Sequence, residues 1–213
     1  MTDFAAARIN MVENQVRCNA VTDFGVITAM SEVAREKFAP AQTKAVAYMD
    51  QDLNVGHGRY LMQPRAFAKL CQAAAISGND TVLDVGCATG YSSAVLARIA
   101  AKVVALEENP ELAEAAKANL AGIAVVVTGP LNKGVPDQGP YDVILLNGSI
   151  PAKPDTLCEQ LAEGGRLMVI IGDGAVGHAT IFVRANETVT ARVIFDSPAQ
   201  PLPGFEVAKS FVF

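Results

Sequence analysis

The sequence predicts an α/β fold with a doubly wound, mostly parallel sheet, and three observations lead to that class. From residue 80 onward, short apolar runs alternate with helical patterns. Each run lacks the polar alternation of a half-exposed strand, which is typical of strands that helices cover on both faces. After Gly172 two strand-like runs follow each other directly, which predicts an antiparallel edge at the C-terminal end.

The N-terminal third has a different pattern, because its apolar residues recur every three to four positions, as in amphipathic helices. These residues are Ile9, Val12, Val16, Ile27, Met30 and Val33, followed in a helix that begins at Pro64 by Phe67, Leu70 and Ala74. A loop is expected around Gly56 and Gly58. We predict one domain, with residues 1–78 as a helical extension on an α/β core of residues 79–213.

The expected core strands are continuous apolar runs. They are TVLDVG from Thr81, KVVALE from Lys102, AVVVTG from Ala124, YDVILLN from Tyr141 and RLMVIIG from Arg166. Helices are expected between them at residues 91–100, 110–120 and 154–163. The second has Asn109 as N-cap and Pro110 at its first position, and the third ends at Gly164-Gly165.

The C-terminal runs are TIFVRAN from Thr180 and TVTARVIFD from Thr188. Asn186-Glu187 between them is typical of a hairpin turn. Three prolines then precede a β-prone ending, SFVF from Ser210. An antiparallel edge on the parallel sheet fits this ending.

Composition and charge exclude several classes of function. The chain has 213 residues, 17 Lys+Arg against 22 Asp+Glu, and a net charge of −5. This balance gives no long-range attraction for a phosphate backbone, so we expect no nucleic-acid partner. No apolar run approaches the roughly 20 residues of a membrane span, and the first ten residues do not resemble a signal peptide. The four cysteines form no CxxC pair, so we expect reduced thiols and a cytoplasmic location.

A glycine loop follows the first core strand and predicts the ligand site, because ligands of such sheets bind at the carboxyl ends of the strands. The segment from Asp84 to Gly90 reads D-x-G-x-x-x-G. Gly86 permits a tight turn, Gly90 permits a close approach of helix to strand, and exposed N–H groups suit an anionic group. This spacing differs from the G-x-G-x-x-G of dehydrogenases and indicates S-adenosylmethionine.

The second strand supports a nucleoside ligand. Its last residue is Glu107, 21 positions after Gly86 (107 − 86), the distance at which an acidic side chain meets ribose hydroxyls in this architecture. Alternatives remain open: Glu107 and Glu108 as a solvated strand end, NAD as the ligand, or no nucleotide. Asp84 interrupts an apolar strand, so it either contacts the ligand's amino group or braces its own loop.

Several segments together resemble the protein-L-isoaspartate (D-aspartate) O-methyltransferases. They are MVENQVR from Met11, VITAMSEVAREKFAP from Val26, AYMDQDLNVGHG from Ala47, VLDVGCATGYSSAVLA from Val82, PYDVILLNGSIP from Pro140 and LCEQLAEGGRLMVIIG from Leu157. The resemblance covers nearly the whole chain. It implies the Rossmann-like fold of class I methyltransferases and methylation of isoaspartyl residues in damaged proteins with S-adenosylmethionine.

Loop and resemblance together imply two sets of site residues. Cofactor contacts are expected from Asp84, Gly86, Cys87, Ala88, Gly90, Glu107, Glu108 and Leu131. Substrate contacts are expected from Arg59, Tyr60, Met62 and Gln63. No catalytic residue is assigned, because Met62 occupies the position at which the resemblance implies a serine. A carboxylate acceptor is already ionised at pH 7 and needs no general base.

The sequence departs from the family at two places. Tyr60 and Met62 stand where the family has a Thr/Ser-Ile-Ser hydroxyl pair, and a thioether donates no hydrogen bond. Pro130 stands where the family has an acidic residue that can bind the adenine amino group. A different acceptor in a more apolar pocket, or a non-catalytic sensor or scaffold, are therefore the alternatives to isoaspartyl methylation.

Other candidate polar residues carry weaker predictions. His57 is expected in a loop and His178 at the surface. Asn147-Gly148-Ser149 is predicted to form a turn after the fourth core strand. This turn either borders the acceptor pocket or has no functional role. No metal site is expected, because the chain has no H-x-x-H motif and no Cys/His cluster.

Overall fold

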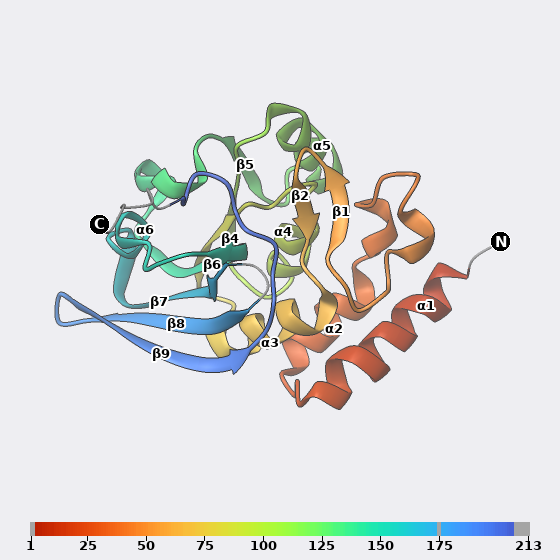
Figure 1. Ribbon diagram of the computed structural model, residues 1–213, viewed down its shortest axis with the longest axis horizontal. Helices are drawn as coiled ribbons and strands as arrows, with labels where there is room; N and C mark the ends of the chain where they lie inside the picture. The colour runs from red at the N-terminus through yellow and green to blue at the C-terminus, as the bar shows by residue number, and fades with distance from the viewer. Residues whose placement is uncertain (1–2, 174–175, 207–213) are drawn as a thin grey trace, which may run out of the picture.

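The computed structural model describes residues 3–173 and 176–206, and its centre is a seven-stranded sheet (Figure 1). The strand order is β5-β4-β3-β6-β7-β8-β9. The strands are β3 (Thr81–Val85), β4 (Lys102–Glu107), β5 (Val125–Thr128), β6 (Tyr141–Ile150), β7 (Leu161–Gly172), β8 (Gly177–Ala185) and β9 (Thr188–Asp196). The first five are parallel, and β8 and β9 pair antiparallel at one edge. The predicted fold class is confirmed.

Helices and short turns cover the two faces of the sheet. The helices are α1 (Phe4–Met11), α2 (Phe24–Glu32), α3 (Pro64–Ala74), α4 (Tyr91–Leu96), α5 (Pro110–Leu120) and α6 (Asp155–Cys158). Successive strand residues alternate between two cores: Val103 packs with α3 and α4, whereas Val104 packs with α6. Both faces are buried, which explains the continuous apolar runs. In the described ranges, no helix has both the length and the apolar character that a membrane crossing requires.

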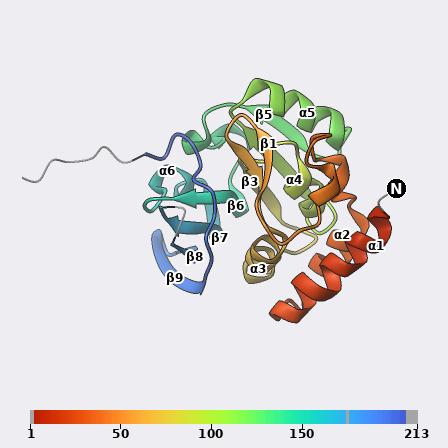
Figure 2. The same ribbon diagram turned by 45° about the vertical axis from the view of Figure 1, so that its right-hand side comes forward.

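The N-terminal segment shares its core with the sheet and contains a hairpin that the sequence did not reveal. The predicted helical spacing is confirmed in α2 and α3, and α1 continues through a wider helical turn at Val12–Val16. The predicted loop around Gly56 and Gly58 is instead the turn of a separate two-stranded sheet, β1 (Leu53–Gly56) with β2 (Arg59–Leu61). The turned view shows the hairpin beside the central sheet (Figure 2).

Two of the expected core helices are shorter than predicted. The helix expected at residues 91–100 ends at Leu96 as α4, and the other is the one expected at residues 154–163. Residues 154–163 were expected to be helical, but α6 covers only Asp155–Cys158, and β7 already begins at Leu161. Leu161 pairs with Tyr141 of β6, and a register shift between Leu161 and Arg166 absorbs the extra residues. Pairing with β6 therefore outweighs helix propensity here.

The C-terminal hairpin forms as predicted. Asn186 and Glu187 both adopt positive φ, at 50° and 63°, as a tight turn between β8 and β9 requires. The segment from Ser197 to Glu206 then runs back over the carboxyl ends of the parallel strands. We call it the tail. The β-prone SFVF lies outside the described residues.

Arg166 of β7, which pairs with Val143 of β6, holds the end of α3 against the sheet. Its Nη2 donates to the Ala75 carbonyl at 2.7 Å and to Asp80 Oδ2 at 2.6 Å, and its Nη1 donates to the Asp142 carbonyl at 3.2 Å. Burial alone raises the pKa of Asp80, but hydrogen bonds from Ser77 and Arg166 outweigh it and hold that pKa below its usual value. The ionised carboxylate is therefore part of the folded structure.

We expect Asp80→Asn to lower the free energy of unfolding at pH 7 by about 1–3 kcal/mol, because a charge-assisted bond is lost. Since the folded pKa is depressed, this contribution is complete above the unfolded pKa of about 3.9 and disappears as pH falls through the folded value. Urea unfolding at pH 7 and pH 3 measures it. The exposed control Asp137→Asn changes stability little, and an equal loss in both variants contradicts the assignment.

Candidate active site

The glycine loop lies at the carboxyl end of β3, as predicted, and is folded tightly against β4. Gly86 adopts φ +74° and Gly90 φ +97°, and Ala88 takes the left-handed region at φ +51°. Gly86 N and Cys87 N both donate to the Leu106 carbonyl, at 2.8 and 3.1 Å. The N–H groups expected to face an anionic ligand are thus bound within the protein at these two positions.

Gly90 permits a close approach, but to a different element from the one expected. A Cβ built on Gly90 would lie 3.1 Å from Leu120 Cγ and 3.4 Å from the Ala116 Cβ. Both contacts belong to α5, not to a strand. The glycine therefore packs the start of α4 against α5.

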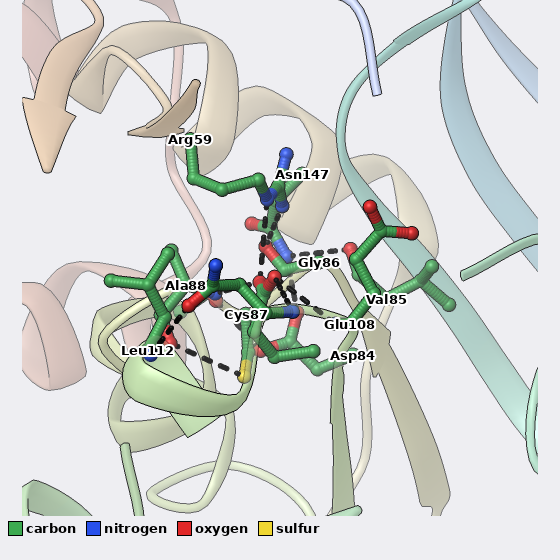
Figure 3. A network of polar contacts seen from close by, with 12 residues as sticks. Arg59, Asp84, Val85, Gly86, Cys87, Ala88, Glu108, Leu112 and Asn147 are labelled. Atoms are coloured by element: carbon green, nitrogen blue, oxygen red, sulfur yellow. Dashed lines mark hydrogen bonds and ion pairs between the residues drawn. The ribbon is translucent and has the colours of Figure 1, made fainter. Parts of the chain in front are cut away.

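Asp84 is completely buried and braces the loop from beneath (Figure 3). Its Oδ2 accepts hydrogen bonds from Ser92 Oγ at 2.6 Å and Ser93 Oγ at 2.5 Å, and its Oδ1 accepts one from Asn147 Nδ2 at 2.6 Å. Burial raises the pKa of Asp84, and these three hydrogen bonds oppose the rise. The side chain thereby connects β3, α4 and β6.

Glu107 is also completely buried and lies at the carboxyl end of β4. Its Oε1 accepts from the backbone N–H groups of Glu108 and Asn109, both at 3.1 Å. Its Oε2 accepts from Ala88 N at 2.8 Å and from Arg59 Nε at 3.3 Å. The solvated strand end considered from the sequence is wrong for Glu107, whereas Glu108 is half-buried.

Arg59 reaches this carboxylate from β2 and fills the space above the glycine loop (Figure 3). Its side chain is only 3% exposed, and its Nη2 donates to the Gly86 carbonyl at 2.8 Å. The sequence placed Arg59 among the substrate contacts, but the structure places it against the expected cofactor residues. A buried carboxylate needs a cation or hydrogen-bond donors. This requirement is the one feature of the sequence that could have indicated a basic partner such as Arg59 for Glu107.

The remaining expected contacts divide between two places. Tyr60 and Met62 line a hollow beside Gly86, and Met62 is buried. Gln63 instead donates to Ser197 Oγ at 3.2 Å and to the Pro198 carbonyl at 3.1 Å, so it holds the tail. Leu131 is completely buried in the core on the α6 side of the sheet.

Asn147 is not in a turn after the fourth core strand, because β6 continues to Ile150. Besides Asp84, its Nδ2 faces the Val85 carbonyl at 3.2 Å, and its side chain lines the hollow with Tyr60 and Met62. Ser149 N donates to the Gln200 carbonyl and Leu202 N to the Ser149 carbonyl, both at 2.8 Å. The tail therefore pairs with the C-terminal end of β6.

The two histidines lie at the surface. His57 Nε2 is 3.2 Å from Glu111 Oε2, and His178 Nδ1 is 2.7 Å from Asp196 Oδ1. Neither side chain lines the hollow beside Gly86. Within residues 3–173 and 176–206, no group of three or more His, Cys, Asp or Glu side chains is placed to hold a metal ion.

Comparisons with known proteins assign the chain to a family. The family model described as protein-L-isoaspartate(D-aspartate) O-methyltransferase matches residues 7–196. The chain belongs to this family. A protein-L-isoaspartate O-methyltransferase of Methylorubrum populi is 41% identical over 81% of this chain and 82% of its own. A protein-L-isoaspartate O-methyltransferase from a Roseiflexus species is 35% identical over 95% of this chain and 94% of its own.

Solved structures of the family have the same fold. A protein-L-isoaspartate O-methyltransferase superposes with a TM-score of 0.80 at 25% identity, over 92% of this chain and 66% of that one. A protein from Plasmodium falciparum described as a putative family member, solved with S-adenosyl-L-homocysteine, gives a TM-score of 0.79 at 19% identity, over 95% and 99%. The family resemblance predicted from the sequence is confirmed.

We expect Gly86→Ala to destabilise the protein more than Gly58→Ala. Both glycines have positive φ, which costs an alanine roughly 1–2 kcal/mol. A Cβ built on Gly86 would also lie 2.3 Å from Arg59 Nη2. A Cβ built on Gly58 would meet no atom within 4 Å beyond the neighbouring residues in the chain. Urea unfolding of the two variants measures the difference, and equal losses would mean that Arg59 does not lie against the loop.

Proposed function

We propose that this chain transfers a methyl group from S-adenosylmethionine to the carboxylate of isoaspartyl residues in damaged proteins. The observation that carries the proposal is the buried carboxylate of Glu107, placed directly beside the tight glycine loop in a member of this family. A carboxylate accepts two ribose hydroxyl bonds. We further propose that the work takes place in the cytoplasm, where the four free cysteines stay reduced.

The chemistry of these residues fits the cofactor. Cofactor contacts are proposed for Gly86, Cys87, Ala88, Gly90, Glu107 and Glu108, with substrate contacts for Tyr60 and Met62, which line the hollow. Asp84, Leu131 and Gln63 keep the structural contacts described above. When bound, the cofactor would supply a sulfonium methyl group, whose carbon–sulfur bond would break as a carbon–oxygen bond forms to the acceptor. Opposite charges neutralise in this step, so the protein's part is to position the acceptor and exclude water.

Each buried group has a part that follows from its contacts. Asp84 holds β3, α4 and β6 together beneath the loop, which keeps the loop rigid. Glu107 is proposed to accept hydrogen bonds from the ribose hydroxyls. Asn147 orients Asp84 and lines the hollow that Tyr60 and Met62 also line. Because the acceptor carboxylate is ionised at neutral pH, no residue has to remove a proton.

Met62 decides how well the acceptor is held. Its buried thioether cannot donate to a carboxylate, so we expect slow methylation of an isoaspartyl peptide. Met62→Ser adds a donor, and a hydrogen bond to a charged group is worth about 1.5–3 kcal/mol, or roughly tenfold or more in kcat/KM. Methyl-labelled S-adenosylmethionine with the isoaspartyl peptide measures the rate.

Two controls make this comparison specific. Met62→Ala leaves a similar cavity without the hydroxyl, so the ratio of the serine to the alanine variant isolates the donor. The same peptide with a normal aspartate reports unspecific labelling. If neither variant methylates the isoaspartyl peptide while another family enzyme does, the acceptor is a different molecule. If the protein binds the cofactor but transfers no methyl group to any acceptor, it is a sensor or scaffold.

A further inference from the structure

The proposed ribose site has no free hydrogen-bonding capacity. An ionised carboxylate has about four acceptor positions. At Glu107 four donors lie within 3.3 Å of its oxygens, namely Glu108 N, Asn109 N, Ala88 N and Arg59 Nε. Three of these are backbone groups that hold the loop and the start of α5. Arg59 is the one donor that a ligand can replace without unfolding either element.

A second side chain closes the same place from the opposite end of the chain. Leu202 of the tail is 3% exposed. A Cβ built on Gly86 would lie 3.1 Å from Leu202 Cδ2, and one on Gly148 would lie 2.8 Å from Leu202 Cγ. The hairpin and the tail therefore meet over the glycine loop, connected through Gln63 and Ser197.

Little space is left beside the glycine loop. The hollow lined by Tyr60, Met62, Gly86 and Asn147 has a volume of about 10 Å³, close to what one water molecule needs. Sites for small-molecule ligands and cofactors have volumes of about 300–1,000 Å³. A nucleoside ligand therefore enters only if the hairpin or the tail moves.

We propose that Arg59 and Leu202 are an autoinhibitory closure of the cofactor site. In the free protein Arg59 competes with the ribose for Glu107, and Leu202 covers Gly86. This inference rests on the proposed function, because it takes S-adenosylmethionine or its demethylated product as the ligand. The fold allows opening, since β1 and β2 form their own sheet and share no ladder with the central one.

The closure predicts that removing either side chain improves binding. We expect Arg59→Gln to bind S-adenosylhomocysteine at least tenfold more tightly than the unaltered protein in calorimetry, because the ribose no longer displaces a cation. Leu202→Ala opens the site from the tail without changing charge, and we expect tighter binding there too. Arg98→Gln removes an exposed ion pair with Glu32 and serves as the control, with unchanged affinity.

Thermal unfolding without ligand gives a second readout. Arg59→Gln leaves Glu107 buried without its cation, so the free variant melts at a lower temperature, while added S-adenosylhomocysteine raises its melting temperature more than that of the unaltered protein. If Arg59→Gln does not fold, Leu202→Ala carries the test.

The outcomes separate the two proposals. If the unaltered protein, Arg59→Gln and Leu202→Ala all bind with the same affinity, the closure is wrong and the methyltransferase proposal stands. If none of them binds S-adenosylmethionine or S-adenosylhomocysteine, both proposals are wrong. Tighter binding by both variants, with Arg98→Gln unchanged, supports both.

Discussion

The completely buried carboxylate of Glu107 is the constraint on which the site depends. A charge without solvent needs opposite charge or several donors, and the structure supplies both. Ala88 N comes from the glycine loop, Glu108 N and Asn109 N from the start of α5, and Arg59 from the hairpin. These three parts of the chain therefore converge on Glu107 at the end of β4. A buried ion pair of this kind is weak evidence for net stability, but losing one partner costs several kcal/mol.

Asp84 shows the opposite solution to the same physical problem. Among the residues that the structure describes no cation contacts it, and its partners are two serine hydroxyls and the Asn147 amide. Burial raises its pKa, whereas Glu107, at the end of the neighbouring strand β4, lies against the Arg59 guanidinium. One carboxylate thus braces the loop as a structural part. The other is held by a contact that a ligand can exchange, which is what a binding group requires.

Much of the fold follows from local pattern, whereas the closure of the site does not. The strands β3 to β7 appear in the sequence because burial on both faces demands continuous apolar runs. The hairpin at β1 and β2 was missed because its seven strand residues include polar and glycine positions with little strand signal. The helix expected at residues 154–163 ends early because Leu161 pairs with Tyr141 of β6 and begins β7. Spacing from Gly86 identified Glu107, but Arg59 lies 48 residues earlier, and only the folded hairpin brings them together.

The most direct test is a crystal structure of the unaltered protein with S-adenosylhomocysteine. We expect the ribose hydroxyls to lie on Glu107, the Arg59 guanidinium to have left that carboxylate, and Leu202 to have withdrawn from Gly86. A structure in which the ligand is bound while Arg59 and Leu202 keep their present contacts would contradict the role assigned to Glu107 and the closure together.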